Sequence, residues 1–105
     1  MINDTTWPVK HPAERVTAEF DFGPSLAASD TLASVQLIVT TVQGVDAAPS
    51  AVIYGAAQLR GARAFQKLTG GLAGCSYRVE CRGTTTNDNL LILARVLQCL
   101  LTDLT

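Results

Sequence analysis

The sequence predicts an all-β fold, an antiparallel β-sandwich of about six to eight short strands. Several segments alternate apolar and polar residues with the period of two that is expected of half-buried strands. Gly, Pro, Asn and Asp separate these segments at intervals of about eight to twelve residues, which is typical of strands joined by turns. The 105 residues suffice for one such domain, and the immunoglobulin-like arrangement is the commonest fold of this kind.

The first two strands are expected at residues 16–22 and 32–42. Gly23 and Pro24 end the first strand, and the connection that follows can hold a short helical turn at residues 26–28. The apolar residues of each strand lie two positions apart and should face the core. They are Val16, Ala18, Phe20 and Phe22 in the first strand and Val35, Leu37 and Val39 in the second.

Three further strands are expected in the middle of the chain, two short ones near residues 52–54 and 58–60 and a third at residues 64–68. Glycines at residues 70–74 then connect this third strand to the next one. A phosphate-binding loop would end in Lys-Ser or Lys-Thr and begin a helix, whereas this stretch leads into an alternating segment. We therefore interpret it as a turn between strands.

The last two strands are predicted at residues 76–82 and 90–97, with a polar turn between them at residues 83–89. In the strand at residues 76–82, the side chains that should face the core are Tyr77, Val79 and Cys81. The intervening side chains should face water: Ser76, Arg78, Glu80 and Arg82.

The sandwich proper should span residues 16–97, with an extended arm at residues 1–15 and a Leu-rich tail at residues 98–105 that fits a helix or an extended strand equally well. Two prolines stiffen the arm, and Trp7 precedes the first strand, so it should pack at an edge or on a neighbour. The predicted partner interface consists of Trp7, Pro8, Leu100, Leu101 and Leu104. The alternative is that both ends fold back onto their own domain.

Charge and hydropathy exclude several classes of protein. Eight Lys and Arg against nine Asp and Glu leave a net charge of −1, so no global field attracts nucleic acid or an anionic membrane. No apolar run approaches the roughly 20 residues of a membrane-spanning helix. No secretory signal is visible at residues 1–10, which predicts a protein made in the cytoplasm.

No catalytic, cofactor-binding or metal-ligating residues are predicted. Cys75, Cys81 and Cys99 form no C-x-x-C pair, and a tetrahedral zinc site needs about four ligands. His11 is in a polar segment without an acidic partner that would orient it for nucleophilic catalysis. The three cysteines are expected to be buried free thiols.

The order and spacing of several short motifs resemble those of small tailed-phage virion proteins of the fiber-tail adaptor type, which have an immunoglobulin-like fold. The shared motifs are Phe20-Asp21-Phe22, Asp30-Thr31-Leu32-Ala33-Ser34, Gly55-Ala56-Ala57-Gln58-Leu59, Gly70-Gly71-Leu72-Ala73-Gly74 and Thr84-Thr85-Thr86, together with Lys10, Pro12, Glu14, Gly44-Val45-Asp46, Tyr77 and Cys81. The resemblance implies a non-enzymatic structural protein, an adaptor or joining component in the tail or the head-to-tail neck. It would be made in the bacterial host cytoplasm and reside in the virion, bound to other tail, neck or fiber proteins.

Copies of the chain should also contact one another in a symmetric assembly. Residues 1–50 carry six acidic and two basic residues, whereas residues 51–105 carry six basic and three acidic ones. Two surfaces of opposite charge would suit a head-to-tail ring, unless folding mixes the charges of the two halves. Two other functions stay open: a capsid decoration protein and a stand-alone immunoglobulin-like module that binds sugar or peptide.

Overall fold

The computed structural model describes residues 4–101, which form seven strands and two short 3-10 helices. The strands are β1 (Asp4–Thr6), β2 (Val16–Asp21), β3 (Leu32–Gln43), β4 (Ile53–Arg60), β5 (Arg63–Leu68), β6 (Ser76–Thr85) and β7 (Leu90–Gln98). The 3-10 helices are η1 (Gly23–Ser25) and η2 (Pro49–Val52). The molecule is elongated, with principal extents of 48 × 27 × 27 Å.

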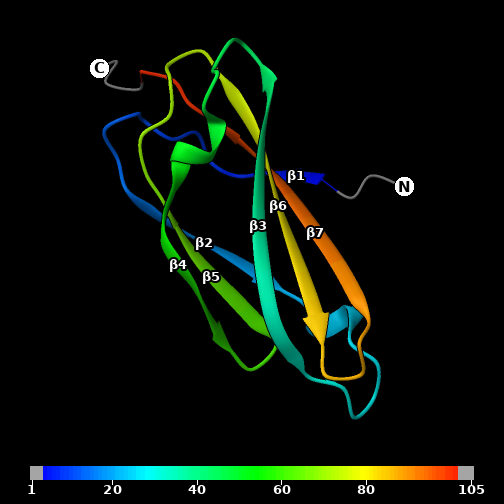
Figure 1. Ribbon diagram of the computed structural model, residues 1–105. Coiled ribbons are helices and arrows are strands. Elements are labelled where there is room, and N and C mark those ends of the chain that lie inside the picture. Colours follow the sequence, from blue (N-terminus) through cyan, green and yellow to red (C-terminus); the bar gives the residue numbers. More distant parts are fainter. Residues whose placement is uncertain (1–3, 102–105) are drawn as a thin grey trace.

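Two sheets pack face to face (Figure 1). One has the strand order β1-β7-β6-β3 and the other β2-β5-β4. All pairs are antiparallel except β1 with β7, which are parallel. An immunoglobulin domain opposes its C, F and G strands to its B, E and D strands, and β3, β6 and β7 face β2, β5 and β4 in the same way. The predicted immunoglobulin-like β-sandwich is therefore confirmed.

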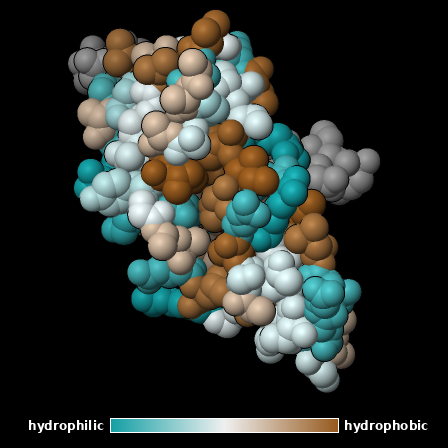
Figure 2. Space-filling model, in the orientation of Figure 1, coloured by the Kyte–Doolittle hydropathy of each residue, from teal (hydrophilic) through white to brown (hydrophobic). Residues whose placement is uncertain are grey.

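The core is formed by the alternating residues that the sequence indicated. Phe20, Phe22, Tyr77, Val79 and Cys81 are fully buried. Figure 2 shows that apolar side chains also reach the surface in the middle of one face, where η2 and β4 pass beside β3.

Two side chains differ from the prediction for their faces. Val16, expected in the core, is 37% exposed because it is the first residue of β2, which is an edge strand of its sheet. Ser76, expected in water, is buried, since β6 is a central strand and Gln43 of β3 and Gln98 of β7 flank this position.

The boundaries of three segments also differ from the prediction. The two short strands expected near residues 52–54 and 58–60 are one strand, β4, interrupted by a bulge between Tyr54 and Gln58. Strand β6 continues to Thr85, into the predicted polar turn. A Cβ atom on Gly83 would lie 2.7 Å from Leu32 Cδ1 and 3.2 Å from the Phe22 ring, so a larger residue would require these core side chains to shift. The short helical turn expected at residues 26–28 lies earlier, at η1.

Candidate interaction surfaces

The two terminal segments that were predicted to carry the interface lie side by side along β7. The backbone N–H of Trp7 donates to the Val96 carbonyl at 2.9 Å, and the N–H of Lys10 donates to the Gln98 carbonyl at 2.9 Å. The N–H of Leu100 in turn donates to the Lys10 carbonyl at 3.0 Å. The beginning of the tail is therefore extended as far as Leu101, and Leu104 lies outside the described residues.

The two segments expose four apolar residues, which we call the terminal edge: Pro8, Val9, Leu100 and Leu101. Leu101 is 60% exposed, and Val9 and Leu100 are also accessible. Pro8 is exposed as well. Trp7, by contrast, is half-buried, and its ring meets the Phe20 ring edge to face at a centroid distance of 5.5 Å. Trp7 therefore fixes the path of the segment, and Pro8 and Val9 directly after it are exposed.

Lys10 holds this segment against the sandwich, a role that was not predicted, although Lys10 is one of the residues that carry the family resemblance. Its side chain is 1% exposed, and its Nζ donates to the carbonyls of Gly70 at 2.7 Å and His11 at 3.0 Å. Burial lowers the pKa of the ammonium group, although Cys99 and Glu14 nearby favour its charge. Because lysine is rarely buried, residue type gave no signal of this role.

The glycine connection is anchored to the core by Tyr77. Its hydroxyl accepts a hydrogen bond from the Leu72 N–H at 2.9 Å and donates one to Asp46 Oδ2 at 2.7 Å. A tyrosine near the start of this strand that bonds a backbone group just upstream is the tyrosine corner of immunoglobulin sandwiches. Asp46 Oδ1 also accepts the Ala48 N–H at 2.9 Å within its own loop. The Tyr77 hydroxyl therefore joins the loop after β3 to the glycine connection after β5.

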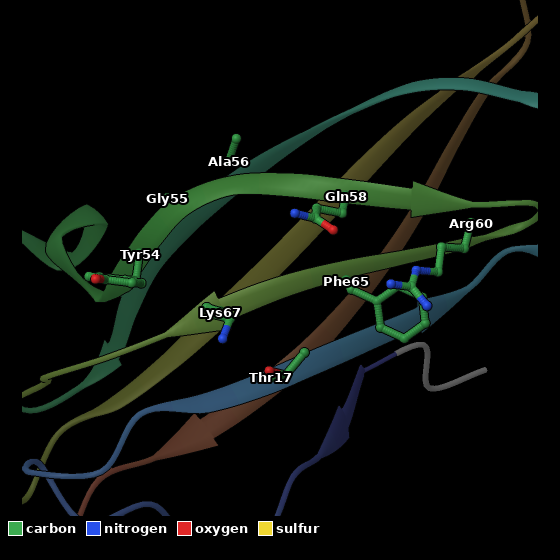
Figure 3. Close-up of a pocket in the computed structure, with 8 residues that line it drawn as sticks. All are labelled: Thr17, Tyr54, Gly55, Ala56, Gln58, Arg60, Phe65 and Lys67. Atoms are coloured by element: carbon green, nitrogen blue, oxygen red, sulfur yellow. The ribbon is translucent and has the colours of Figure 1, made fainter.

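A groove opens on the outer face of the β2-β5-β4 sheet, with a volume of about 470 Å³. It is lined by Thr17, Tyr54, Gly55, Ala56, Gln58, Arg60, Phe65 and Lys67 (Figure 3). Arg60 lies over the Phe65 ring at 5.9 Å from its centroid, and Arg15 lies over the Tyr54 ring at 4.0 Å. The groove thus combines aromatic rings with cationic side chains.

The bulge in β4 forms one wall of this groove, and a buried glutamine fixes it. Gln66 is 2% exposed, and its Nε2 donates to the carbonyls of Tyr54 and Gly55, both at 3.1 Å. Gly55 has a φ of +74°, which favours glycine. Sequence periodicity missed this feature because a bulge interrupts the alternation on which the prediction depends.

The three cysteines are buried in the core, and the histidine takes part in a local hydrogen bond. All three thiols are buried and free, as predicted, and burial raises the pKa of Cys81 to about 12, which disfavours the nucleophilic thiolate. His11 Nδ1 accepts the Ala13 N–H at 2.9 Å within a turn. Residues 4–101 hold no group of His, Cys, Asp and Glu that could bind a metal ion.

The fold mixes part of the charge asymmetry of the two chain halves. Arg63 approaches Glu19 at 3.3 Å and Asp21 at 3.8 Å across the β2–β5 pair. Glu80 is paired with Arg78 and Arg82 on β6. Arg60 and Lys67 form no ion pair with any described residue, so the groove keeps a basic character.

The β-sandwich thus presents two candidate contact surfaces, exposed apolar residues beside one sheet and a basic groove on the other. The family model of the podophage GP4 fiber-tail adaptor protein gp77 matches residues 10–98, and the chain belongs to this family. No curated protein matches it.

Family membership confirms the resemblance seen in the motifs. It places the chain among the structural components of tailed phages, in the virion and in contact with other tail or fiber proteins. No helix within residues 4–101 is long and apolar enough to cross a membrane.

Proposed function

We propose that this protein is a non-enzymatic adaptor that joins a fiber to the tail, or to the head-to-tail neck, of a podophage particle. It is made in the cytoplasm of the bacterial host and then assembled into the virion with other copies of itself, without binding nucleic acid. Membership of the fiber-tail adaptor family supports the joining role. The net charge of −1 supports contacts with proteins rather than with DNA.

The terminal edge is the observation that carries this proposal. The segment that contains Pro8 and the one that contains Leu100 come from opposite ends of the chain and meet at Lys10, because β1 and the residues after it follow β7. Exposed apolar residues that gather on a rigid strand edge mark a protein contact. Trp7 acts as a positioning residue there, since its ring packs on Phe20, and Leu104 extends the same apolar sequence pattern.

A pair of matched substitutions tests the proposal. Leu101→Ser and Leu90→Ser each remove an exposed leucine, of 60% and 57% exposure respectively, at opposite ends of the β7 region. Both variants should fold and melt as the wild type does. In particles assembled with each variant in place of the wild type, Leu101→Ser should reduce the copy number of the protein, whereas Leu90→Ser should not.

Cryo-electron microscopy of the same particles locates the protein. Density at the tail or neck, next to a fiber, is the expected result. Equal incorporation of both variants would refute the terminal edge as the interface, and density spread over the capsid surface would show a decoration protein instead.

A further inference from the structure

We infer that the basic groove on the β2-β5-β4 sheet binds residues 101–104 of a second copy of this chain. The contact joins two different surfaces, the groove of one copy and the tail of the next, and so it is heterologous and can close into a ring. This inference rests on the proposed adaptor function for its biological setting, but its test in solution does not depend on it.

The groove is a built feature of the sheet. Between Tyr54 and Gln58, β4 leaves the regular ladder with β5, and the buried Gln66 amide occupies the gap by bonding the carbonyls of Tyr54 and Gly55. A buried side chain with these hydrogen bonds makes the bulge a fixed part of the fold. The wall of the groove is therefore preformed, and binding needs little ordering of the host sheet.

The lining specifies the chemistry of the occupant. Phe65 and Tyr54 offer aromatic surface, while Lys67 and Arg60 place two cations at the same hollow. Neither cation has an ion-pair partner among the described residues, whereas Arg63 on the neighbouring stretch of β5 is paired with Glu19 and Asp21. The groove thus fits an extended segment in which apolar side chains flank a carboxylate.

The acidic residues described in the chain leave few candidates for that carboxylate. Most of them are already engaged within the molecule, by Arg63, by the β6 arginines, by hydrogen bonds in loops or by a turn: Glu19, Asp21, Glu80, Asp30, Asp46 and Glu14. The sequence offers one segment with the required pattern, Leu101-Thr102-Asp103-Leu104. Leu101 is 60% exposed where the chain enters this segment.

The tail of a neighbouring copy fits the groove better than the tail of the same copy. The tail follows β7, which belongs to the first sheet, whereas the groove opens on the outer face of the second sheet. Residues 102–104 span at most about 11 Å when fully extended. The molecule measures 27 Å in its narrower directions, so a second copy is the occupant that the geometry favours.

Charge reversal on each side of the contact tests the inference. Light scattering with size-exclusion chromatography measures the mass of the full chain and of the variants Lys67→Glu and Asp103→Lys over a range of concentrations. The wild type should self-associate, and each variant alone should associate at least about tenfold more weakly because like charges then meet at the contact. Lys67→Arg, which keeps the charge, is the matched control and should behave as the wild type.

An equal mixture of the two reversed variants gives the decisive result. The groove of the Lys67→Glu variant and the tail of the Asp103→Lys variant again carry opposite charges, and the unaltered groove and tail also match. The mixture should therefore associate more strongly than either variant alone. A wild type that is monomeric up to about 1 mM overturns the inference, since the Kd of the contact would then be weaker than about 1 mM. So does a mixture that remains monomeric.

Particle incorporation separates this inference from the proposed function. If Lys67→Glu loses incorporation while the wild type is monomeric in solution, the groove binds a different virion protein, which refutes the second copy as its occupant and leaves the adaptor function standing. If the mixture associates but the protein is found in no particle, the adaptor function fails and the contact between copies stands.

Discussion

The hydroxyl of Tyr77 joins the carboxylate of Asp46, 2.7 Å away, to the backbone N–H of Leu72 at 2.9 Å. One buried side chain on β6 thereby fixes two loops, the one between β3 and η2 and the one between β5 and β6. This bond to the tyrosine hydroxyl holds the pKa of Asp46 below its usual value, while burial and the same bond raise the pKa of Tyr77. The neighbouring Lys10 bonds the carbonyl of Gly70 in the same glycine connection.

Replacing Tyr77 with Phe should lower the free energy of unfolding by about 1–3 kcal/mol, since the protein loses a hydrogen bond to the charged Asp46 carboxylate and one to the Leu72 N–H, both partly buried. Urea unfolding measures this loss. Tyr54→Phe is the matched control, because the Tyr54 ring is 45% exposed, and it should change stability by less than about 0.5 kcal/mol. Equal stability of Tyr77→Phe and the wild type would show that the hydroxyl bonds do not hold the loops.

Truncating Phe20 to Ala should cost about 3–5 kcal/mol, because the ring is fully buried and packs against Trp7. A domain of this size has little stability to spare, so the variant should melt at a much lower temperature or fail to fold. Thermal unfolding followed by circular dichroism checks this. Phe65→Ala removes a ring from the outer face of its sheet and should lower the stability less than Phe20→Ala does. A larger loss of stability for Phe65→Ala would contradict the assignment of the two residues to the outer face and the core.

Stability should fall as the pH rises above about 9. The pKa of Cys81 is raised from 9.0 to about 12 by burial, so the unfolded chain loses this proton at a lower pH than the folded chain does. The folded state then binds more protons, and the stabilisation present below pH 9 is lost progressively up to about pH 12. Cys99 and Tyr77 act in the same direction, whereas the lowered pKa of Lys10 opposes them.

The variant Cys81→Ala isolates the contribution of this thiol. Its stability should depend less on pH between 9 and 12 than that of the wild type, although it is lower at neutral pH because of the cavity that it creates. Urea unfolding at pH 7, 9 and 10.5 gives the comparison. If the free energy of unfolding falls equally steeply with pH in the two proteins, the Cys81 thiol ionises as readily in the folded state as in the unfolded one.

The strands that could be predicted from sequence are those whose alternation is uninterrupted. Buried residues lie at every second position, as expected, at Phe20 on β2 and Phe22 just after it, and at Tyr77 and Val79 on β6. Strand β4 was divided in two because its bulge breaks the period of two at Gly55. Periodicity reports the faces of one strand, and it carries no information on a local insertion held by a side chain from another strand.

The surfaces were predictable only in part, for a similar reason. The exposure of Leu100 and Leu101 followed from an apolar stretch outside the alternating strands. The contact of Leu100 with Lys10 depends on the parallel path of the N-terminal segment along β7, which joins opposite ends of the chain. The burial of Lys10 and Gln66 could not be predicted, because polar residues are buried only where the finished fold supplies their hydrogen-bond partners.

Replacing Gln66 with Leu tests whether this buried amide holds the bulge of β4. The two side chains are similar in size, but leucine leaves the carbonyls of Tyr54 and Gly55 without the donor that they have in the wild type. The free energy of unfolding should fall by about 1–3 kcal/mol, as expected for buried acceptors that lose a hydrogen bond. Hydrogen exchange should show faster opening of β4 around Gly55, while the amides of β6 keep their protection relative to global unfolding. Gln58→Leu, an exposed position on the same strand, is the control and should leave both measurements unchanged. A Gln66→Leu variant as stable as the wild type, with unchanged exchange in β4, would show that Gly55 and the backbone alone determine the bulge.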